Sequence, residues 1–271
     1  MFKFVLTAAA ALLLQTSVFA AEIPVDIRVN DNFLKVDSRP YIEEDTVFAP
    51  IRAISEALGG AVEWNADARY ASIHCGGNEI TLYADGGGIY LNGEKQSGKN
   101  PEIRNGRFMV PVRAISNLLG AEVDWNDEYR YVEVAADGIE LPDSMTDHTY
   151  THDDVYWLAR IIHAESQGES FEGKLAVGDV ILNRVESSEF PDTIYDVIFD
   201  RNYAIQFEPV ANGTVYNTPG KDSIAAAKLA MTSESSIGDC LYFFSPKNSP
   251  VNWINKNREF YSAIGNHEFY L

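Results

Sequence analysis

A glutamate on an otherwise apolar helix stripe is the residue of this sequence best suited to acid–base chemistry. The stripe recurs at helical spacing: Val155, Leu158, Ala159 and Ile162. Asp153 or Asp154 is the expected N-cap, and Glu165 projects from the edge of the buried face. Partial desolvation would raise its pKa and keep the carboxyl protonated near neutral pH, as a general acid requires. The alternative is a helix-end glutamate that is paired with a basic side chain or turned to solvent.

The first twenty residues have the pattern of a secretory signal peptide. Lys3 gives a short basic start, residues 4–14 are apolar, and Val18, Phe19 and Ala20 form a small-residue cleavage site. No later segment has the ~20 apolar residues that a membrane crossing needs. We expect cleavage after Ala20 and a secreted protein, extracellular or associated with the cell wall.

Composition limits the classes of partner. The chain has 21 basic and 40 acidic residues and a net charge of −19, which argues against nucleic acid or anionic lipid. The length after signal removal suffices for two modest domains. Cys75 and Cys240 fall in different expected domains, so we predict two free, half-buried thiols.

A duplication with an offset of 61 residues occupies residues 24–136. Residues 50–59 align with 111–120, 62–65 with 123–126, and 69–70 with 130–131. Each copy predicts a proline at a helix start, a short amphipathic helix, a glycine stop and then strands. Arg52 and Arg113 recur at equivalent positions, which fits shared packing better than a binding role.

The repeated Pro-x-Arg, Leu-Gly and Trp-Asn elements resemble the copper amine oxidase N-terminal-like domain, a stalk module of exported proteins. The resemblance implies a duplicated ββαβ-type stalk that acts as a spacer or contacts the wall or a partner protein. No clustered His or Cys ligands that could hold copper are present. The acidic, aperiodic residues 137–152 predict a linker.

Residues 153–271 predict a second, mostly helical domain, which makes the whole chain α+β. An apolar helix around residues 175–185 is expected at its centre, followed by an alanine-rich helix over 223–231 and a strand at 241–244. Seven blocks of this domain resemble the SleB/CwlJ cell-wall hydrolases, the spore cortex-lytic enzymes: 159–169, 171–178, 180–185, 190–191, 206–210, 241–246 and 264–270. That resemblance implies a lysozyme-like lytic transglycosylase fold, peptidoglycan glycan strands as substrate, no cofactor, and Glu165 as the catalytic acid.

The number of carboxyl groups in the active site decides whether the bond between N-acetylmuramic acid and N-acetylglucosamine is cleaved by hydrolysis or by transglycosylation. Hydrolysis generally needs a second carboxylate across the scissile bond. A lytic transglycosylase needs one, because Glu165 can protonate the bridging oxygen and then accept a proton from the C6 hydroxyl. Glu169 and Glu172 are the available second carboxylates, and the nearby glycines at 168 and 173 place them on the cleft rim. Transglycosylation is therefore favoured.

Polar and aromatic residues of the matching blocks are the expected substrate-binding groups: Ser166, Gln206, Tyr242, Asn266 and His267. Amides hydrogen-bond acetamido and hydroxyl groups, and tyrosine stacks on pyranose faces. Ser166 could instead orient Glu165 or only end the helix, and Tyr242 could instead pack internally. For Phe243 and Phe244, alternation along a strand requires one of the two to be inside.

Three other functions remain open. A zinc N-acetylmuramoyl-L-alanine amidase would need gathered histidines, but the five histidines are scattered, so no metal site is expected. A cysteine peptidase would pair Cys240 with His267, yet Asp239 would raise the pKa of that thiol. A non-catalytic wall-binding protein would have lost Glu165, which is intact.

Overall fold

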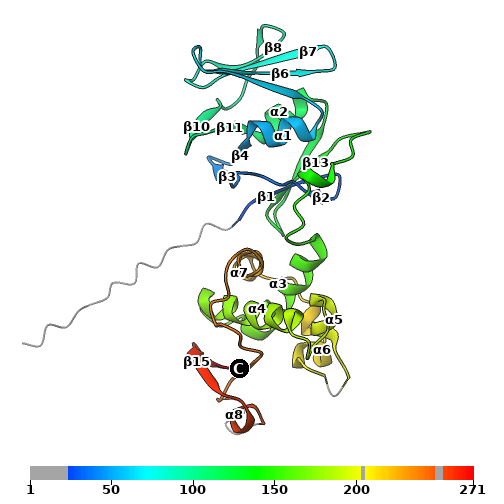
Figure 1. Cartoon of the computed structure of the whole chain (residues 1–271), viewed down its shortest axis with the longest axis vertical. Coiled ribbons are helices and arrows are strands. Elements are labelled where there is room, and N and C mark those ends of the chain that lie inside the picture. The colour runs from blue at the N-terminus through cyan, green and yellow to red at the C-terminus, as the bar shows by residue number, and fades with distance from the viewer. Residues whose placement is uncertain (1–23, 203–204, 248–252) are drawn as a thin grey trace, which may run out of the picture.

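The computed structural model describes residues 24–202, 205–247 and 253–271, which form two stacked parts (Figure 1). The predicted signal peptide lies outside the described residues. Over the described ranges, no helix has the length and apolar character that a membrane span requires. We refer to the elements up to β13 as the duplicated part, and to those from α3 onward as the helical part.

The two copies of the repeat fold alike, with matching elements 61 residues apart. The first copy comprises β3 (Tyr41–Glu43), β4 (Thr46–Pro50), α1 (Ile51–Ala57), β5 (Ala61–Asn65) and β6 (Tyr70–Cys75). The second comprises β10 (Glu102–Arg104), β11 (Arg107–Pro111), α2 (Val112–Leu118), β12 (Glu122–Asn126) and β13 (Tyr131–Ala135). Each unit is thus ββαββ, one strand longer than the expected ββαβ. Pro50 and Pro111 are the N-caps, and Gly59 and Gly120 end the helices at φ +78° and +86°.

Both copies contribute to a shared sheet of order β10-β11-β4-β3. An insert between the copies, β7 (Asn78–Tyr83), β8 (Gly88–Leu91) and β9 (Glu94–Lys95), extends β5 and β6 into a second sheet. β1 (Asp26–Val29) runs parallel to β13, and β2 (Asn32–Phe33) pairs with β1. The core of this part is aliphatic, with Ile54, Ile73 and Ile115 fully buried between helices and sheets.

Residues 137–152, expected as a linker, pack against the duplicated part. Leu141 joins its core, and the short helix η1 (Asp143–Met145) is flanked by two backbone bonds to β2 and the residues that follow it. Lys35 N donates to Met145 O at 2.8 Å, and Asp147 N donates to Phe33 O at 2.8 Å. A polar, aperiodic segment can still be held by its backbone groups, which side-chain pattern does not report.

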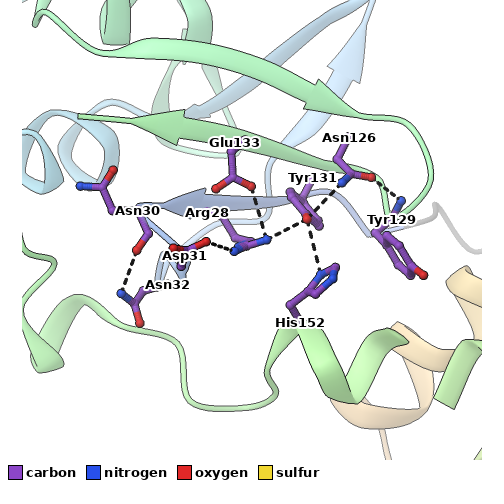
Figure 2. Close-up of polar contacts among 9 residues, drawn as sticks. All are labelled: Arg28, Asn30, Asp31, Asn32, Asn126, Tyr129, Tyr131, Glu133 and His152. Carbon is purple, nitrogen blue, oxygen red and sulfur yellow. Dashed lines mark hydrogen bonds and ion pairs between the residues drawn. The ribbon is translucent and has the colours of Figure 1, made fainter. Parts of the chain in front are cut away.

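Polar side chains join the two parts (Figure 2). The Tyr131 hydroxyl accepts hydrogen bonds from Arg28 at 2.8 Å and Asn126 at 3.1 Å, and lies 3.4 Å from Nδ1 of His152 on the first helix of the helical part. Beside this cluster, the fully buried Lys228 forms a 2.5 Å ion pair with Asp26. Buried ionic contacts of this kind hold a defined relative orientation because breaking one leaves a desolvated charge.

The helical part is built around three mutually packed helices, α3 (His152–Ser166), α4 (Phe171–Glu186) and α7 (Lys221–Thr232). The other helices of this part are α5 (Ile194–Phe199), α6 (Glu208–Asn212), η2 (Thr214–Tyr216) and α8 (Ile254–Asn257). Its strands are β14 (Tyr242–Phe244), which precedes α8, and β15 (Phe260–Ile264) and β16 (His267–Tyr270), which follow it. α4 packs against α3, α5 and α7, as its apolar sequence predicted. The strands form a sheet of order β14-β16-β15.

The start of α3 differs from expectation. Thr151, not Asp153 or Asp154, is the N-cap: its Oγ1 accepts from Asp154 N at 3.2 Å, and the Asp154 carboxylate accepts from Thr151 N at 2.8 Å. This reciprocal capping box satisfies two backbone donors at once, which a single aspartate cap would not do.

Candidate active site

An open cavity of about 1,410 Å³ lies where the C-terminal end of α3 meets α4, α6 and β14. Its lining includes carboxyl and aromatic side chains: Glu165, Glu189, Asp200, Glu208, Phe190, Phe207, Tyr242, Phe243, Phe244 and Trp253. Ionisable groups beside apolar ring faces are the environment in which carboxyl pKa values move furthest from their solution range.

Glu165 lies in the last turn of α3 and is half-buried in this cavity. The apolar stripe below it is inside as predicted, with Leu158 and Ile162 fully buried. Burial and, to a smaller extent, the neighbouring carboxylate of Glu208 raise the pKa of Glu165 from 4.5 to about 7, against the opposing effect of the Arg184 cation. A substantial fraction of the carboxyl is therefore protonated at neutral pH, in the direction that the helix pattern predicted.

Arg184 is a cavity residue that the sequence reasoning did not single out. It extends from α4, is 5% exposed, and its Nε donates to Leu241 O at 2.7 Å. Its guanidinium lies 4.8 Å from the ring centre of Phe190, 5.2 Å from that of Phe207 and 5.6 Å from that of Tyr242. Burial lowers its pKa to about 10, so it stays cationic at neutral pH. A cation in the last turn of α4, the helix whose apolar sequence predicted a central position, was the signal that could have identified it.

Glu208, which was also not predicted from the sequence, is the carboxylate that raises the pKa of Glu165. It is the first residue of α6 and lines the cavity, together with Asp200 and Glu189. Glu169 and Glu172, the second carboxylates expected from the sequence, do not line the cavity. Proximity along the chain was a poor guide because the carboxylate that acts on the pKa of Glu165 follows it by 43 residues.

Glu169 has a structural role instead. Its carboxylate accepts hydrogen bonds from Asn266 N at 2.9 Å and Asn266 Nδ2 at 2.8 Å, which lower its pKa. Gly265 (φ +59°) lies against it so closely that an added β-carbon would overlap Glu169 Oε2. A glycine is required there both for the left-handed backbone and for the close approach.

The expected substrate-binding residues divide into two groups. Gln206, Tyr242 and His267 line the cavity. Ser166 does not: it is 1% exposed and its Oγ donates to Ile162 O at 2.5 Å, so it ends the helix. Asn266 is exposed and its side chain holds Glu169, so it also lies outside the cavity. In this structure the side chains of Ser166 and Asn266 are therefore engaged by local partners and do not line the cavity.

The aromatic residues of β14 and the buried histidine shape one wall. Tyr242 faces the cavity and its hydroxyl accepts from Arg258 at 2.6 Å. Phe244 is 9% exposed and Phe243 is half-buried. His267 is 7% exposed and lies edge-on to Phe243 at 5.4 Å; burial lowers its pKa, so the imidazole is neutral at neutral pH. A neutral ring both donates and accepts hydrogen bonds.

The metal and thiol alternatives find no support in the described geometry. Across residues 24–202, 205–247 and 253–271, no three His, Cys, Asp or Glu side chains are grouped to hold a metal ion. Both cysteines are free, and Cys240 is fully buried where a half-buried thiol was expected. Burial raises the pKa of the Cys240 thiol to about 11, so it is not a thiolate nucleophile.

Comparisons with known proteins match both parts of the chain. Residues 168–270 match the family model described as Cell Wall Hydrolase. Over 127 residues the chain is 31% identical to the cell wall hydrolase CwlJ of Bacillus subtilis; the match spans 44% of this chain and 86% of that protein. The chain belongs to the cell wall hydrolase family. Residues 28–134 of this family member match the copper amine oxidase N-terminal domain model.

Two further relatives resemble the helical part of this cell wall hydrolase. A spore cortex-lytic enzyme of Bacillus cereus is 37% identical over 120 residues, 44% of this chain and 45% of the enzyme, so the chain spans less than half of that relative. The solved catalytic domain of the germination-specific lytic transglycosylase SleB from Bacillus anthracis is 34% identical, with a TM-score of 0.41, and the match covers 48% of this chain and all of that domain.

Proposed function

We propose that this protein cleaves peptidoglycan glycan strands between N-acetylmuramic acid and N-acetylglucosamine as a lytic transglycosylase, with Glu165 as the catalytic acid. The observation that carries the proposal is a half-buried carboxyl, with its pKa raised to about 7, at the wall of a large open cavity. The family match begins at residue 168, three positions after Glu165, so this assignment depends on the geometry of the site.

The single carboxyl can serve both halves of the reaction. Protonated Glu165 donates its proton to the bridging oxygen as the bond from that oxygen to C1 of the muramic sugar breaks. The resulting carboxylate then accepts the proton of the C6 hydroxyl while the C6 oxygen bonds to C1, which closes an anhydro ring. No water is consumed, and Glu165 ends protonated. A pKa near neutrality suits a group that must give and take a proton in turn.

The surrounding charges fit the positive charge that develops on the sugar. The carboxylate of Glu208 would stabilise an oxocarbenium-like transition state across the cavity. Arg184 partly offsets that negative field and keeps the pKa of Glu165 from rising further. Gln206, Tyr242 and His267 supply hydrogen-bonding and ring faces for the flanking sugars.

Location and substrate follow from the same proposal. A signal peptide ending at Ala20 would export the chain to the cell wall. The similar proteins include a spore cortex-lytic enzyme and a germination-specific lytic transglycosylase. We infer that a peptidoglycan glycan strand, of cortex or vegetative wall, is the substrate of this chain.

One observation favours a second candidate, hydrolysis. Glu208 supplies the second carboxylate that was missing from the sequence reasoning, and a carboxylate across the cavity could activate a water molecule. The two reactions differ in products, because hydrolysis leaves reducing muramic ends and transglycosylation leaves anhydro ends.

Mass spectrometry of digested peptidoglycan tests both the activity and its type. The full chain should release fragments with anhydromuramic ends, and Glu165→Gln should abolish release. Glu172→Gln is the matched control, since this exposed carboxylate lies outside the cavity. Reducing ends that disappear in Glu208→Gln would establish hydrolysis, and wall lysis by Glu165→Gln would overturn the assignment of the acid.

A further inference from the structure

The two copies of the repeat differ at several packing positions, and one of these lies beside a tryptophan. Trp64 of the first copy and Trp125 of the second are equivalent, and so are Val47 and Phe108 on the strands of the shared sheet. Each tryptophan approaches the strand of the other copy. Trp64 packs on Phe108, with ring centres 5.3 Å apart. Trp125 and Val47, a much smaller side chain than phenylalanine, instead line one cavity together.

A cavity of about 610 Å³ occupies this place in the second copy. Val47, Val123 and Trp125 line it together with several polar side chains. Val47 is smaller than the equivalent Phe108, so this position leaves more room beside the tryptophan in the second copy. The Trp64–Phe108 ring contact and the cavity lined by Trp125 and Val47 distinguish the two copies at this place.

Trp125 is fixed rather than free to close this space. Its Nε1 donates to Asp127 Oδ1 at 3.3 Å, and the Arg130 guanidinium lies 5.8 Å from its ring centre. Asp127 in turn forms a 3.2 Å ion pair with Lys221 of α7, which lowers the pKa of the carboxylate. A held indole costs little entropy when a ligand stacks on it.

The polar lining mixes both signs of charge. Asp45, Asp124 and Asp127 supply carboxylates, and Arg113 and Arg130 supply guanidinium groups. The guanidinium of Arg113 is already bonded to the carbonyl of Val123. Such a balance fits neither a polyanion nor a strongly cationic peptide, whereas hydroxyl and acetamido groups can accept from guanidinium and donate to carboxylate.

We propose that this cavity is a saccharide-binding site, in which Trp125 stacks on a pyranose ring of an amino-sugar chain and the charged residues of the lining hydrogen-bond its substituents. The choice of an amino sugar depends on the proposed function of the helical part. The site would hold one stretch of insoluble glycan while the Glu165 cavity acts on another. Tethering of this kind raises the effective concentration of substrate at the catalytic site without changing its chemistry.

Fluorine NMR of the full chain tests binding directly. The protein carries Glu165→Gln to prevent turnover and 5-fluorotryptophan as the label, and single Trp→Phe variants assign the signals. Titration with the β-1,4-linked tetramer of N-acetylglucosamine should move the Trp125 signal and leave the Trp64 signal in place. Val47→Phe, which copies the packing of the first repeat, should abolish the Trp125 shift, as should Asp124→Ala combined with Asp45→Ala if Val47→Phe fails to fold.

Several outcomes would overturn the proposal. These are a Trp125 signal unmoved at millimolar tetramer, a shift that persists in Val47→Phe, and a shift produced by a free stem peptide but not by the sugar. With Glu165 intact, Val47→Phe should slow digestion of insoluble peptidoglycan by roughly tenfold and leave digestion of soluble fragments unchanged. If Val47→Phe digests insoluble peptidoglycan as fast as the parent does, tethering is refuted. If the parent digests neither substrate, the proposed function is refuted, and saccharide binding at Trp125 is then judged by the NMR titration alone.

Discussion

Replacement of Glu165 by glutamine should make the protein inactive and, at alkaline pH, more stable. The folded-state pKa of about 7 lies above the unfolded value of 4.5, so the folded chain binds more protons between these limits. Stability therefore falls as pH rises from 4.5 through 7. At 1.36 kcal/mol per pH unit, the loss reaches about 3 kcal/mol once the carboxyl is ionised, an upper value because Glu165 is only half-buried.

Glutamine has nearly the same shape as glutamate but does not ionise, so the variant does not lose folding stability as the pH rises. Urea unfolding followed by far-UV circular dichroism, which reports mainly on α3, α4 and α7, measures the difference. Glu165→Gln should match the parent near pH 4 and exceed its stability by 2–3 kcal/mol near pH 8, as linkage of the shifted group requires.

Glu169→Gln is the matched control and should change stability in the opposite direction. The hydrogen bonds from Asn266 lower the pKa of Glu169, so its contribution is present above the unfolded pKa and is lost as pH falls through the folded value. Glu169→Gln should therefore be less stable than the parent at neutral pH and approach it in acid. The reasoning fails if Glu165→Gln gains nothing near pH 8, or gains equally at both pH values.

Three further outcomes follow from the same contacts. Glu208→Gln removes a negative charge beside Glu165, so the alkaline limb of the pH–rate profile should move to lower pH; an unmoved limb would show that the two carboxyls do not interact. Lys228→Met leaves Asp26 without its cation and should cost about 3–5 kcal/mol in thermal or urea unfolding, with part of the loss recovered by adding Asp26→Asn. Dialysis against a chelator should leave peptidoglycan lysis unchanged, and loss of activity restored by zinc would instead favour the amidase.

Local sequence pattern was sufficient to predict the repeated helices and the raised pKa of Glu165. The 61-residue repeat predicted two matching helices, α1 and α2, that begin after Pro50 and Pro111. The apolar spacing along α3 predicted both the buried face and the raised pKa of Glu165, because burial of a helix stripe is set by residues three and four apart. These features depend on neighbours in sequence, which a single chain displays directly.

Contacts between distant segments needed the tertiary structure. Ser166 and Asn266 lie in the matching blocks, yet their side chains bind Ile162 and Glu169 and not the cavity. Glu208 reaches Glu165 because the chain returns through α6, some forty residues later. No local spacing encodes that return.

The sequence alone determined the duplication and the helical second half, and it predicted a carboxyl with a raised pKa at Glu165, because each of these depends on periodicity and local chemistry. Only the tertiary structure decided which carboxylate acts on the pKa of Glu165 and where the second cavity lies. Val47 and Phe108 differ visibly in the aligned repeats, but only the structure shows that Phe108 packs on Trp64 whereas Val47 and Trp125 line a cavity. The space left by the smaller side chain exists only once the two copies have come together.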